Sequence, residues 1–413
     1  MFPRPAFFSG VTLNFAENLL FPIQEVDADS PAVIAATETT RETVTWNELR
    51  ERVKLCQSGM IALGLKEGDR VAGYVANHTN ALVAMLAATS LGAVWTAVSP
   101  DTGVHAVLDR LRQIEPALLF ADNAAFYNGR SHPVLPKVTE IARDLTTLRA
   151  VIILPTVASV EFDVRSIPAL SGKTYDYATF TSLKSIPELT FKQLSPDHPV
   201  YILYSSGTTG APKCIVHGAI GTLLQHKKEH IIHCSITPRS RLFYFTTCTW
   251  MMWHWLVSGL ASGATLVLYD GSPFRYLDKS DPSTSVSDDL AMHRLIDELH
   301  ITHFGTSAKY LSILEQKSVD PRSADLSLDK LEAIYSTGSP LAPSTFSYVY
   351  SAFPSTVNLG SITGGTDIIS LFGSPNPLLP VYEGEIQGPG LGMAIAVYDY
   401  TGCLLYTSPS PRD

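Results

Sequence analysis

The sequence predicts an α/β fold with two mainly parallel β-sheets and flanking helices, and three observations lead to this prediction. Short apolar strand patterns alternate with helix patterns along most of the 413 residues. Strands separated by a whole helix need crossover connections, which favour parallel sheets. The alternation occurs in two halves, separated by a stretch rich in Ser, Pro, Thr and Lys over residues 155–199, for which we expect a connector or a long surface excursion. A chain of this length is long enough for two to three packed units.

In the first half, short apolar runs predict strands, and the segments between them have helical character. Ala81–Leu91 is apolar enough for a buried helix. A second helix is indicated by four residues at the 0, 3, 4, 7 spacing of one helix face, namely Val104, Val107, Leu108 and Leu111. The predicted strands are Val71–Val75, Ala93–Val98, Ala117–Phe120 and Val151–Leu154.

The second half repeats this alternation. A helix is expected from Gly221, and another over an apolar stripe from Met292 to Leu299, with its cap near Ser285 and Asp288. The predicted strands are Val200–Tyr204, Cys214–His217, Ala264–Tyr269, Leu331–Tyr335 and Val357–Leu359.

These patterns divide the chain into a first α/β subdomain (1–195), a second α/β subdomain that carries a Gly-rich loop (196–375) and the start of a small β subdomain (376–402). The last residues, 403–413, read CLLYTSPSPRD and back-translate without conflict to a transposon-end sequencing adaptor. We therefore expect a non-native tail there and a natural chain that continues past Gly402, with a genuine Ser/Pro tail as the alternative. A β-sheet cut off near Ile395–Tyr398 would leave an unpaired edge.

Composition excludes several classes of protein. Apolar residues make up 45% and charged residues 17% of the chain, which excludes a disordered polypeptide. The net charge of −9 offers no basic surface for nucleic acid. An anionic substrate would therefore need a local site of positive charge or backbone amides.

The sequence favours a cytoplasmic protein. Its five cysteines are sparse and lack CxxC spacing, which is typical of a reducing compartment. The start, MFPRPAFFSG, has no apolar signal core. The uncharged run Ala81–Val98 contains Thr, Ser and Gly, and so predicts a buried helix, a turn and a strand rather than a membrane span.

The strongest motif is the Gly-rich loop YSSGTTGAPK, from Tyr204 to Lys213. Its glycines let backbone amides turn inward around phosphate oxygens, while its hydroxyls add donors and its lysine adds a positive charge. Pro212 and the β-branched residues after it predict a following strand, so the loop would work without a helix dipole, unlike a Walker loop. The alternative is a solvated Ser/Thr/Gly linker. The predicted phosphate-binding residues are Ser205, Ser206, Gly207, Thr208, Thr209, Gly210 and Lys213.

With this loop, further segments make the chain resemble the adenylate-forming acyl-CoA synthetases, and among them most closely the acetoacetyl-CoA synthetases. The resemblance runs from about Leu13 to Gly402 and includes LNFAENLL, SSGTTGAPK, IVHG, WMMW, STGSPL, NLGSITGGTD and PVYEGEIQGPGLGM. It implies the large N-terminal domain of that family, followed by the start of a small β-barrel subdomain. The family's C-terminal domain, with its catalytic lysine, would be missing, so we expect this chain alone to be inactive or nearly so.

The family joins a carboxylate to the α-phosphate of ATP with Mg²⁺, and then transfers the acyl group to CoA. The resemblance therefore implies a ligase whose substrates are ATP, CoA and acetoacetate. It assigns the β- and γ-phosphates to the Gly-rich loop, the α-phosphate to Thr366, and Mg²⁺ to Asp367, where the superfamily usually has glutamate. It assigns the adenine to Gly338, Ser339 and Pro340. For residues 363–367 alone, an ordinary Gly-Gly turn is the alternative.

The choice of acid would rest on Gly364 and the segment from Thr249 to Trp253. A tryptophan occupies the position of Gly364 in acetyl-CoA synthetases, so glycine would leave room for a longer chain. Trp250, Met251 and Trp253 are the other predicted pocket residues, and a buried core helix is the alternative for them.

Three histidines, His226, His230 and His233, fall close to one helix face. Histidines at such spacing can bind zinc, but the sequence has no HExxH motif. We therefore favour hydrogen-bonded core histidines for these three residues, as for His217. The sequence keeps three rival functions open: another short- or medium-chain acyl-CoA synthetase, a carrier-loading adenylation domain, and a non-catalytic nucleotide-binding protein. It predicts neither the CoA contacts nor the oligomeric state.

Overall fold

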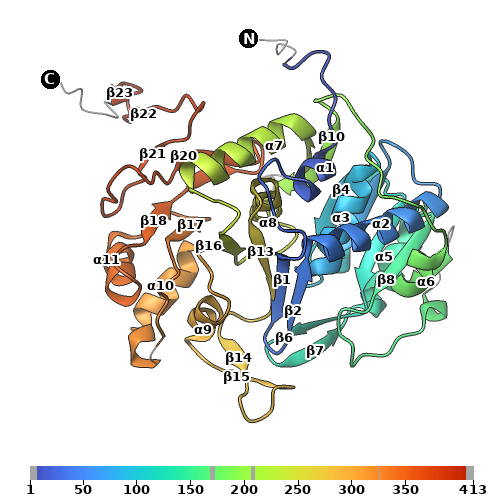
Figure 1. The fold of residues 1–413 in the computed structure, drawn as a ribbon, viewed down its shortest axis with the longest axis horizontal. Helices are drawn as coiled ribbons and strands as arrows, with labels where there is room; N and C mark the ends of the chain where they lie inside the picture. The colour runs from blue at the N-terminus through green and yellow to red at the C-terminus, as the bar shows by residue number, and fades with distance from the viewer. Residues whose placement is uncertain (1–6, 168–172, 206–209, 325, 406–413) are drawn as a thin grey trace.

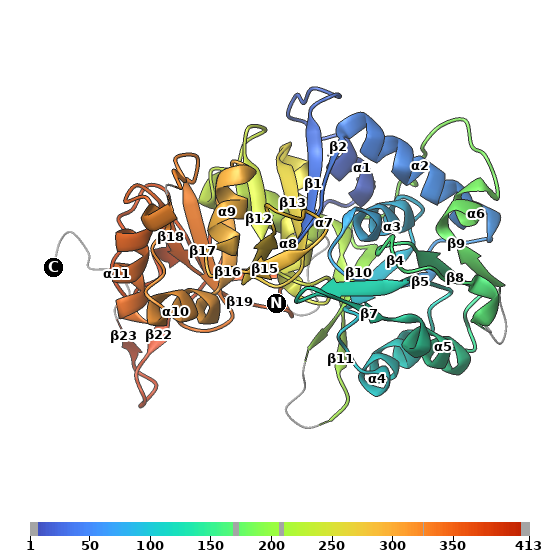
Figure 2. The same cartoon turned by 90° about the horizontal axis from the view of Figure 1, so that it is seen from below.

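Two seven-stranded β-sheets lie side by side and are covered by helices (Figures 1 and 2). The computed structural model describes residues 7–167, 173–205, 210–324 and 326–405. Both sheets are parallel except for one antiparallel strand at an edge of each. The predicted α/β class with two mainly parallel sheets is confirmed. Among the described residues, no helix is both long and apolar enough to cross a lipid bilayer.

The first sheet has six parallel strands and an antiparallel edge strand, β11. Its central strands are buried along their whole length, as expected for a parallel sheet covered on both faces. In spatial order the strands are β11 (Lys213–Gly218), β10 (Pro199–Ser205), β4 (Val94–Val98), β3 (Arg70–Tyr74), β5 (Leu118–Asp122), β8 (Ala150–Leu154) and β9 (Lys173–Asp176).

The second sheet follows the same plan, with β2 as its antiparallel edge strand. In spatial order its strands are β18 (Asn358–Ser361), β17 (Ala333–Thr337), β16 (His303–Ser307), β12 (Arg241–Tyr244), β13 (Thr265–Asp270), β1 (Pro31–Thr37) and β2 (Arg41–Thr45).

The two sheets exchange segments across residue 195, where the sequence predicts a subdomain boundary. The N-terminal strands β1 and β2 belong to the second sheet, because β1 pairs with β13. The strands β10 and β11, which flank the Gly-rich loop, belong to the first sheet, because β10 pairs with β4. The sheets therefore do not divide at 195, and the Gly-rich loop belongs to the first sheet.

Helices and short strands complete the fold. The helices are α1 (Phe15–Leu20), α2 (Trp46–Ala62), α3 (Thr79–Ser90), α4 (Val104–Ile114), α5 (Leu135–Asp144), α6 (Tyr177–Ser182), α7 (Ala219–Lys228), α8 (Met251–Val257), α9 (Ala291–Glu298), α10 (Ala308–Gln316) and α11 (Pro343–Ala352). A π-helical turn (Glu229–His233) continues α7, and 3₁₀ turns cover Val164–Ser166, Ser258–Ser262 and Pro321–Ala324. Short hairpins and ladders are formed by β6 (Ala124–Tyr127), β7 (Arg130–Pro133), β14 (Arg275–Leu277), β15 (Ser285–Ser287), β19 (Thr363–Gly365), β20 (Ser370–Ser374), β21 (Gly388–Pro389), β22 (Val397–Tyr398) and β23 (Leu404–Leu405).

The largest apolar core is shared by both sheets. It includes Trp95 and Tyr201 from the first sheet and Leu266 from the second, together with Trp253 of α8. Helix α3 is buried along nearly its whole length, because its sequence TNALVAMLAATS carries no charge. This confirms that the uncharged run forms a buried helix, a turn and a strand.

A buried carboxylate also joins the two halves. The Glu38 side chain, at the end of β1, accepts hydrogen bonds from the backbone nitrogens of Asn128, Gly129 and Ser272 at 2.7–2.9 Å. It also accepts from the Ser285 hydroxyl at 2.6 Å, and Arg275 Nε lies 3.4 Å away. Because Asn128 and Gly129 form the tip of the β6–β7 hairpin, Glu38 fixes that hairpin to the second half of the chain.

Two local expectations are wrong. The 155–199 stretch contains β9 and α6, which extend the first sheet and pack on α2; β9 is polar and half-exposed, so no apolar run marks it. Residues 285–287 are strand β15, so Ser285 does not cap a helix. Helix α9 begins at Ala291, and Asp288 Oδ1 accepts a hydrogen bond from the nitrogen of the preceding residue, Leu290, at 2.8 Å. Val397 and Tyr398 pair with Leu405 and Leu404, two residues of the segment for which the sequence predicts a non-native tail.

Candidate active site

Two of the predicted site segments begin at the carboxyl ends of neighbouring parallel strands. Gly338–Pro340 follows β17, and β19 follows β18. The Thr337 hydroxyl donates to the Ile362 carbonyl at 3.0 Å, and the Ile362 nitrogen donates to the Ser336 carbonyl at 2.8 Å. Gly338 has φ +94°, a conformation that favours glycine and turns the chain away from the strand. The two segments therefore start side by side at the sheet edge where α/β proteins bind ligands.

Thr366 and Asp367 lie in the tight turn between β19 and β20. The Ile369 nitrogen donates to the Thr366 carbonyl at 3.2 Å and closes the turn. Gly364 sits opposite Leu371, and a Cβ atom there would lie 2.2 Å from the Ser370 carbonyl oxygen. Glycine is thus required by the close approach of two backbones. Within this segment Gly364 and Asp367 are exposed and Thr366 is half-buried, and Gly338, Ser339 and Pro340 are exposed as well.

His217 joins this turn to the strand that follows the Gly-rich loop. Its side chain is buried on β11, and its Nε2 has no hydrogen-bond partner among the described residues. Burial lowers the pKa of His217, while a hydrogen bond to the Thr366 backbone and the charge of Asp367 act to raise it. Both of the influences that raise this pKa come from the turn, so the Thr366–Asp367 pair lies near β11.

The Gly-rich loop connects two strands, as the sequence predicts, and these strands are antiparallel. Ser205, the last residue of β10, pairs with Lys213, the first residue of β11, so both ends of the loop lie together. Gly210 has φ +148°, and the Lys213 side chain is exposed. The Gln113 amide donates to the Pro212 carbonyl at 2.9 Å and holds this end of the loop on α4. Ser206, Gly207, Thr208 and Thr209 lie outside the described residues.

The aromatic segment separates into an exposed and a buried part. Trp250 is the N-cap of α8 with 54% of its side chain exposed, and Met251 is half-buried. Trp253 is fully buried, and its Nε1–H donates to Asn77 Oδ1 at 2.9 Å. These contacts favour the core interpretation for Trp253 and leave Trp250 and Met251 as surface candidates.

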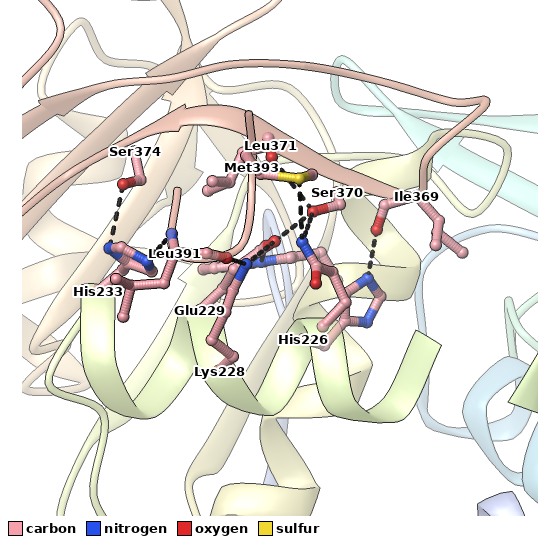
Figure 3. Close-up of polar contacts among 12 residues, drawn as sticks. His226, Lys228, Glu229, His233, Ile369, Ser370, Leu371, Ser374, Leu391 and Met393 are labelled. Carbon is pink, nitrogen blue, oxygen red and sulfur yellow. Dashed lines mark hydrogen bonds and ion pairs between the residues drawn. The ribbon is translucent and has the colours of Figure 1, made fainter. Parts of the chain in front are cut away.

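The histidines of α7 and its π-helical extension are packed into the protein. His226 Nε2 lies 2.7 Å from the Ile369 carbonyl (Figure 3). His233 Nδ1 lies 3.2 Å from the Pro375 carbonyl. His230 is fully buried against the ring of Trp255, with ring centroids 4.3 Å apart. Within the described ranges, no three His, Cys, Asp or Glu side chains form a set of metal ligands. A single exposed carboxylate such as Asp367 fits Mg²⁺, which keeps waters and takes substrate phosphates as further ligands.

The sequence did not single out the residues that support this turn. Gln225 and Glu229 both contact Ser370, and Figure 3 shows Glu229 on the helix beside Ser370. The available signal was the spacing of polar residues on α7. The sequence analysis interpreted the histidines among them as buried core residues but did not identify their hydrogen-bond partners.

Comparison with known proteins agrees with this geometry. A profile of the AMP-binding enzyme family matches residues 23–404, and the chain belongs to that family. Its relatives include a malonamoyl-CoA synthetase of Penicillium aethiopicum, 60% identical over 422 residues, an alignment that covers 100% of this chain and 58% of that protein. An acetoacetyl-CoA synthetase of Danio rerio is 47% identical over 401 residues, covering 96% of this chain and 57% of that protein.

Among solved structures, an acetoacetyl-CoA synthetase from Streptomyces lividans matches with a TM-score of 0.86 and 38% identity, covering 98% of this chain and 60% of that chain. The predicted resemblance to adenylate-forming acyl-CoA synthetases is confirmed. This chain spans about three fifths of the length of the relatives it matches.

Proposed function

We propose that this chain is the nucleotide-binding part of an AMP-forming acid–CoA ligase whose substrate is a short carboxylic acid with a carbonyl group at carbon 3. Acetoacetate is the acid that the sequence predicts, and malonamate is implied by the name of one relative. Both acids carry a carboxylate, one methylene and a carbonyl, and they differ only in a terminal methyl or amino group. We take acetoacetate as the first candidate and malonamate as the second.

One observation carries the proposal: the Thr366–Asp367 turn lies beside Gly338–Pro340 at neighbouring strand ends and near His217 on the strand after the Gly-rich loop. Adenine would lie on Gly338–Pro340 and the α-phosphate at Thr366. The β- and γ-phosphates would lie at the Gly-rich loop, between Ser205 and Lys213. Asp367 would hold Mg²⁺, which neutralises phosphate charge when bound.

The reaction brings one anion to another, so charge and orientation are what the protein must supply. In the first step a carboxylate oxygen attacks the α-phosphorus, and the bond from this phosphorus to pyrophosphate breaks. In the second step the CoA thiolate attacks the acyl carbonyl and AMP leaves. Lys213 contributes positive charge to a protein whose net charge is −9, and the exposed Trp250 and Gly364 would face the acid together with the half-buried Met251.

The test has two parts. Isothermal titration calorimetry measures MgATP affinity on this chain. Carboxylate-dependent ATP–pyrophosphate exchange, with the complete gene product, compares acetoacetate, malonamate and acetate at equal concentration. We expect MgATP binding and faster exchange with either carbonyl acid than with acetate. Faster exchange with acetate would overturn the assignment of the acid, and absence of MgATP binding would overturn the nucleotide site.

A further inference from the structure

One face of α7 and its π-helical extension holds the start of β20, directly after the Thr366–Asp367 turn (Figure 3). The Gln225 amide donates to the Ser370 hydroxyl at 2.7 Å, and that hydroxyl donates to the Glu229 carboxylate. Glu229 also accepts from Trp255 Nε1 at 2.8 Å. His226 holds the preceding residue, Ile369, through its backbone carbonyl.

The orientation of the His226 ring is set from both sides. Its Nε2 lies 2.7 Å from the Ile369 carbonyl oxygen, which can only accept, so Nε2 carries the proton. Its Nδ1 lies 2.8 Å from the Ser258 hydroxyl. Burial lowers the pKa of His226 to about 4, so the ring is neutral at physiological pH. Nδ1 is then an acceptor that faces the Ser258 hydroxyl, and the single proton of this hydroxyl is shared between Nδ1 and the His254 carbonyl, 2.9 Å away.

Ile369 has an unusual backbone conformation. Its φ is +48°, the left-handed region, which is a genuine outlier for a β-branched residue. Such a conformation persists only when its surroundings hold it, and it occurs most often at functional sites. The Ile369 side chain is buried, its nitrogen closes the turn on the Thr366 carbonyl, and its own carbonyl is bound by His226. The strained residue is thus fixed on three sides.

We propose that His226 is a positioning residue for nucleotide binding. By holding the Ile369 carbonyl, it keeps Ile369 left-handed, and the turn then presents Thr366 and Asp367 toward the phosphates and Mg²⁺. The effect of His226 on nucleotide binding rests on the proposed function. Its structural role, that it fixes the turn, does not depend on that function. Gly364 strengthens it, because the hairpin is packed so closely that a Cβ atom at Gly364 would lie 2.2 Å from the Ser370 carbonyl oxygen.

A matched pair of variants separates this role from simple packing. In His226→Gln the amide nitrogen falls near the place of Nε2 and can still donate to Ile369. In His226→Asn the amide falls near the place of Nδ1 and cannot reach that carbonyl. Both variants lose the imidazole ring, so a merely structural role would affect them equally. Leu224→Ala, an exposed position on the same helix, is the surface control.

Two readouts are measured on the purified chain. Hydrogen–deuterium exchange of a peptide covering residues 362–374 should accelerate about 10-fold in His226→Asn and at most about threefold in His226→Gln. MgATP affinity should fall about 10-fold in His226→Asn and be largely restored in His226→Gln. Adenosine affinity, which would depend on Gly338–Pro340, should not change in either variant.

A third variant tests the strain directly. Ile369→Gly removes the steric cost of a positive φ, so adding His226→Asn to this variant should accelerate exchange by less than about threefold.

If His226→Asn does not fold, Ser258→Ala takes its place. We expect a smaller loss in the same direction, because this variant releases the other side of the ring. Equal behaviour of the Gln and Asn variants, or unchanged exchange in all of them, would overturn the positioning role. A wild-type chain without MgATP affinity would instead overturn the proposed function, and the exchange measurements would still decide on His226.

Discussion

The indole nitrogen of Trp253 donates a 2.9 Å hydrogen bond to the Oδ1 atom of Asn77. Asn77 follows β3 of the first sheet, whereas Trp253 belongs to the helix after β12 of the second. The Asn77 amide group also faces the carbonyls of Thr246 and Tyr269, both at 3.4 Å. One buried amide therefore joins the two sheets near their carboxyl ends.

Because of this hydrogen bond between the sheets, we expect Trp253→Phe to destabilise the protein, although Phe is also apolar. The substitution leaves Asn77 Oδ1 buried without a donor, and we expect a loss of about 1–3 kcal/mol in the free energy of unfolding. Urea denaturation followed by circular dichroism measures it. Trp250→Phe is the control, since that side chain is exposed, and should change stability by less than about 0.5 kcal/mol. Equal effects at both positions would contradict the role of the hydrogen bond.

Two adjacent glycines give a second prediction. Gly364→Ala places a Cβ atom 2.2 Å from the Ser370 oxygen, whereas at Gly365 a Cβ atom meets nothing within 4 Å. We expect Gly364→Ala to cost about 1–3 kcal/mol of stability and to weaken MgATP binding, because the β19–β20 hairpin must open. Gly365→Ala should have little effect on either. Thermal unfolding and calorimetry measure the two quantities, and a tolerated alanine at 364 would show that the hairpin is less tightly packed than described.

The buried carboxylate of Glu38 gives a third prediction. Glu38→Ala leaves backbone donors of Asn128, Gly129 and Ser272 without their acceptor and Arg275 without its partner. We expect a loss of about 3–5 kcal/mol, measured by urea denaturation, and a smaller loss for Glu38→Gln. The exposed Glu161→Ala is the control. A loss below about 1 kcal/mol for Glu38→Ala would mean that this joint adds little to stability.

A pH-dependent stability is the fourth prediction. Desolvation by burial raises the pKa of Asp270 from 3.8 to about 7, with the nearby charges of Asp122 and Glu38 acting in the same direction and His78 against it. Between about pH 4 and pH 7, Asp270 is protonated in the folded state but ionised in the unfolded state. The free energy of unfolding therefore falls as the pH rises from about 4 to 7.

Asp270→Asn removes this penalty. We expect the variant to be more stable than the wild type by about 1–3 kcal/mol at pH 8, and the gain to shrink several-fold at pH 4.5. Urea denaturation at the two pH values measures it. A gain that does not depend on pH, or a loss at pH 8, would contradict the raised pKa.

Much of the fold follows from the sequence because its parallel strands are short, apolar and bounded by turn residues. Strands such as β4 and β8 were located to within a residue or two. What could not be predicted was which sheet each strand joins. Nothing in the local pattern of β1 shows that it pairs with β13, more than 200 residues later, because that pairing depends on tertiary contacts. β9 was missed because an exposed edge strand needs no apolar run.

The candidate site was predicted from sequence motifs. Motifs indicate the residues expected to contact a ligand, but not the residues that hold those side chains and turns in position. Thr366 and Asp367 were proposed in this way, and their ligand contacts stay a prediction. The conformation of Ile369 was not, because isoleucine is among the residues least expected at positive φ. His226 was recognised as a core histidine, but its carbonyl partner is 143 residues away, beyond the reach of any local pattern.

The exchange of strands between the sheets also bears on how a ribosome-bound chain can mature. Strand β1 can pair with its parallel neighbour β13 only after Thr265–Asp270 has been synthesised. The first sheet lacks β10 and β11 until Gly218 has left the ribosome. The first sheet, whose strands all lie within residues 70–218, can thus be completed before the second, whose strands lie on both sides of that stretch in the sequence. Early segments stay exposed for a long interval, during which chaperones have the greatest opportunity to bind them.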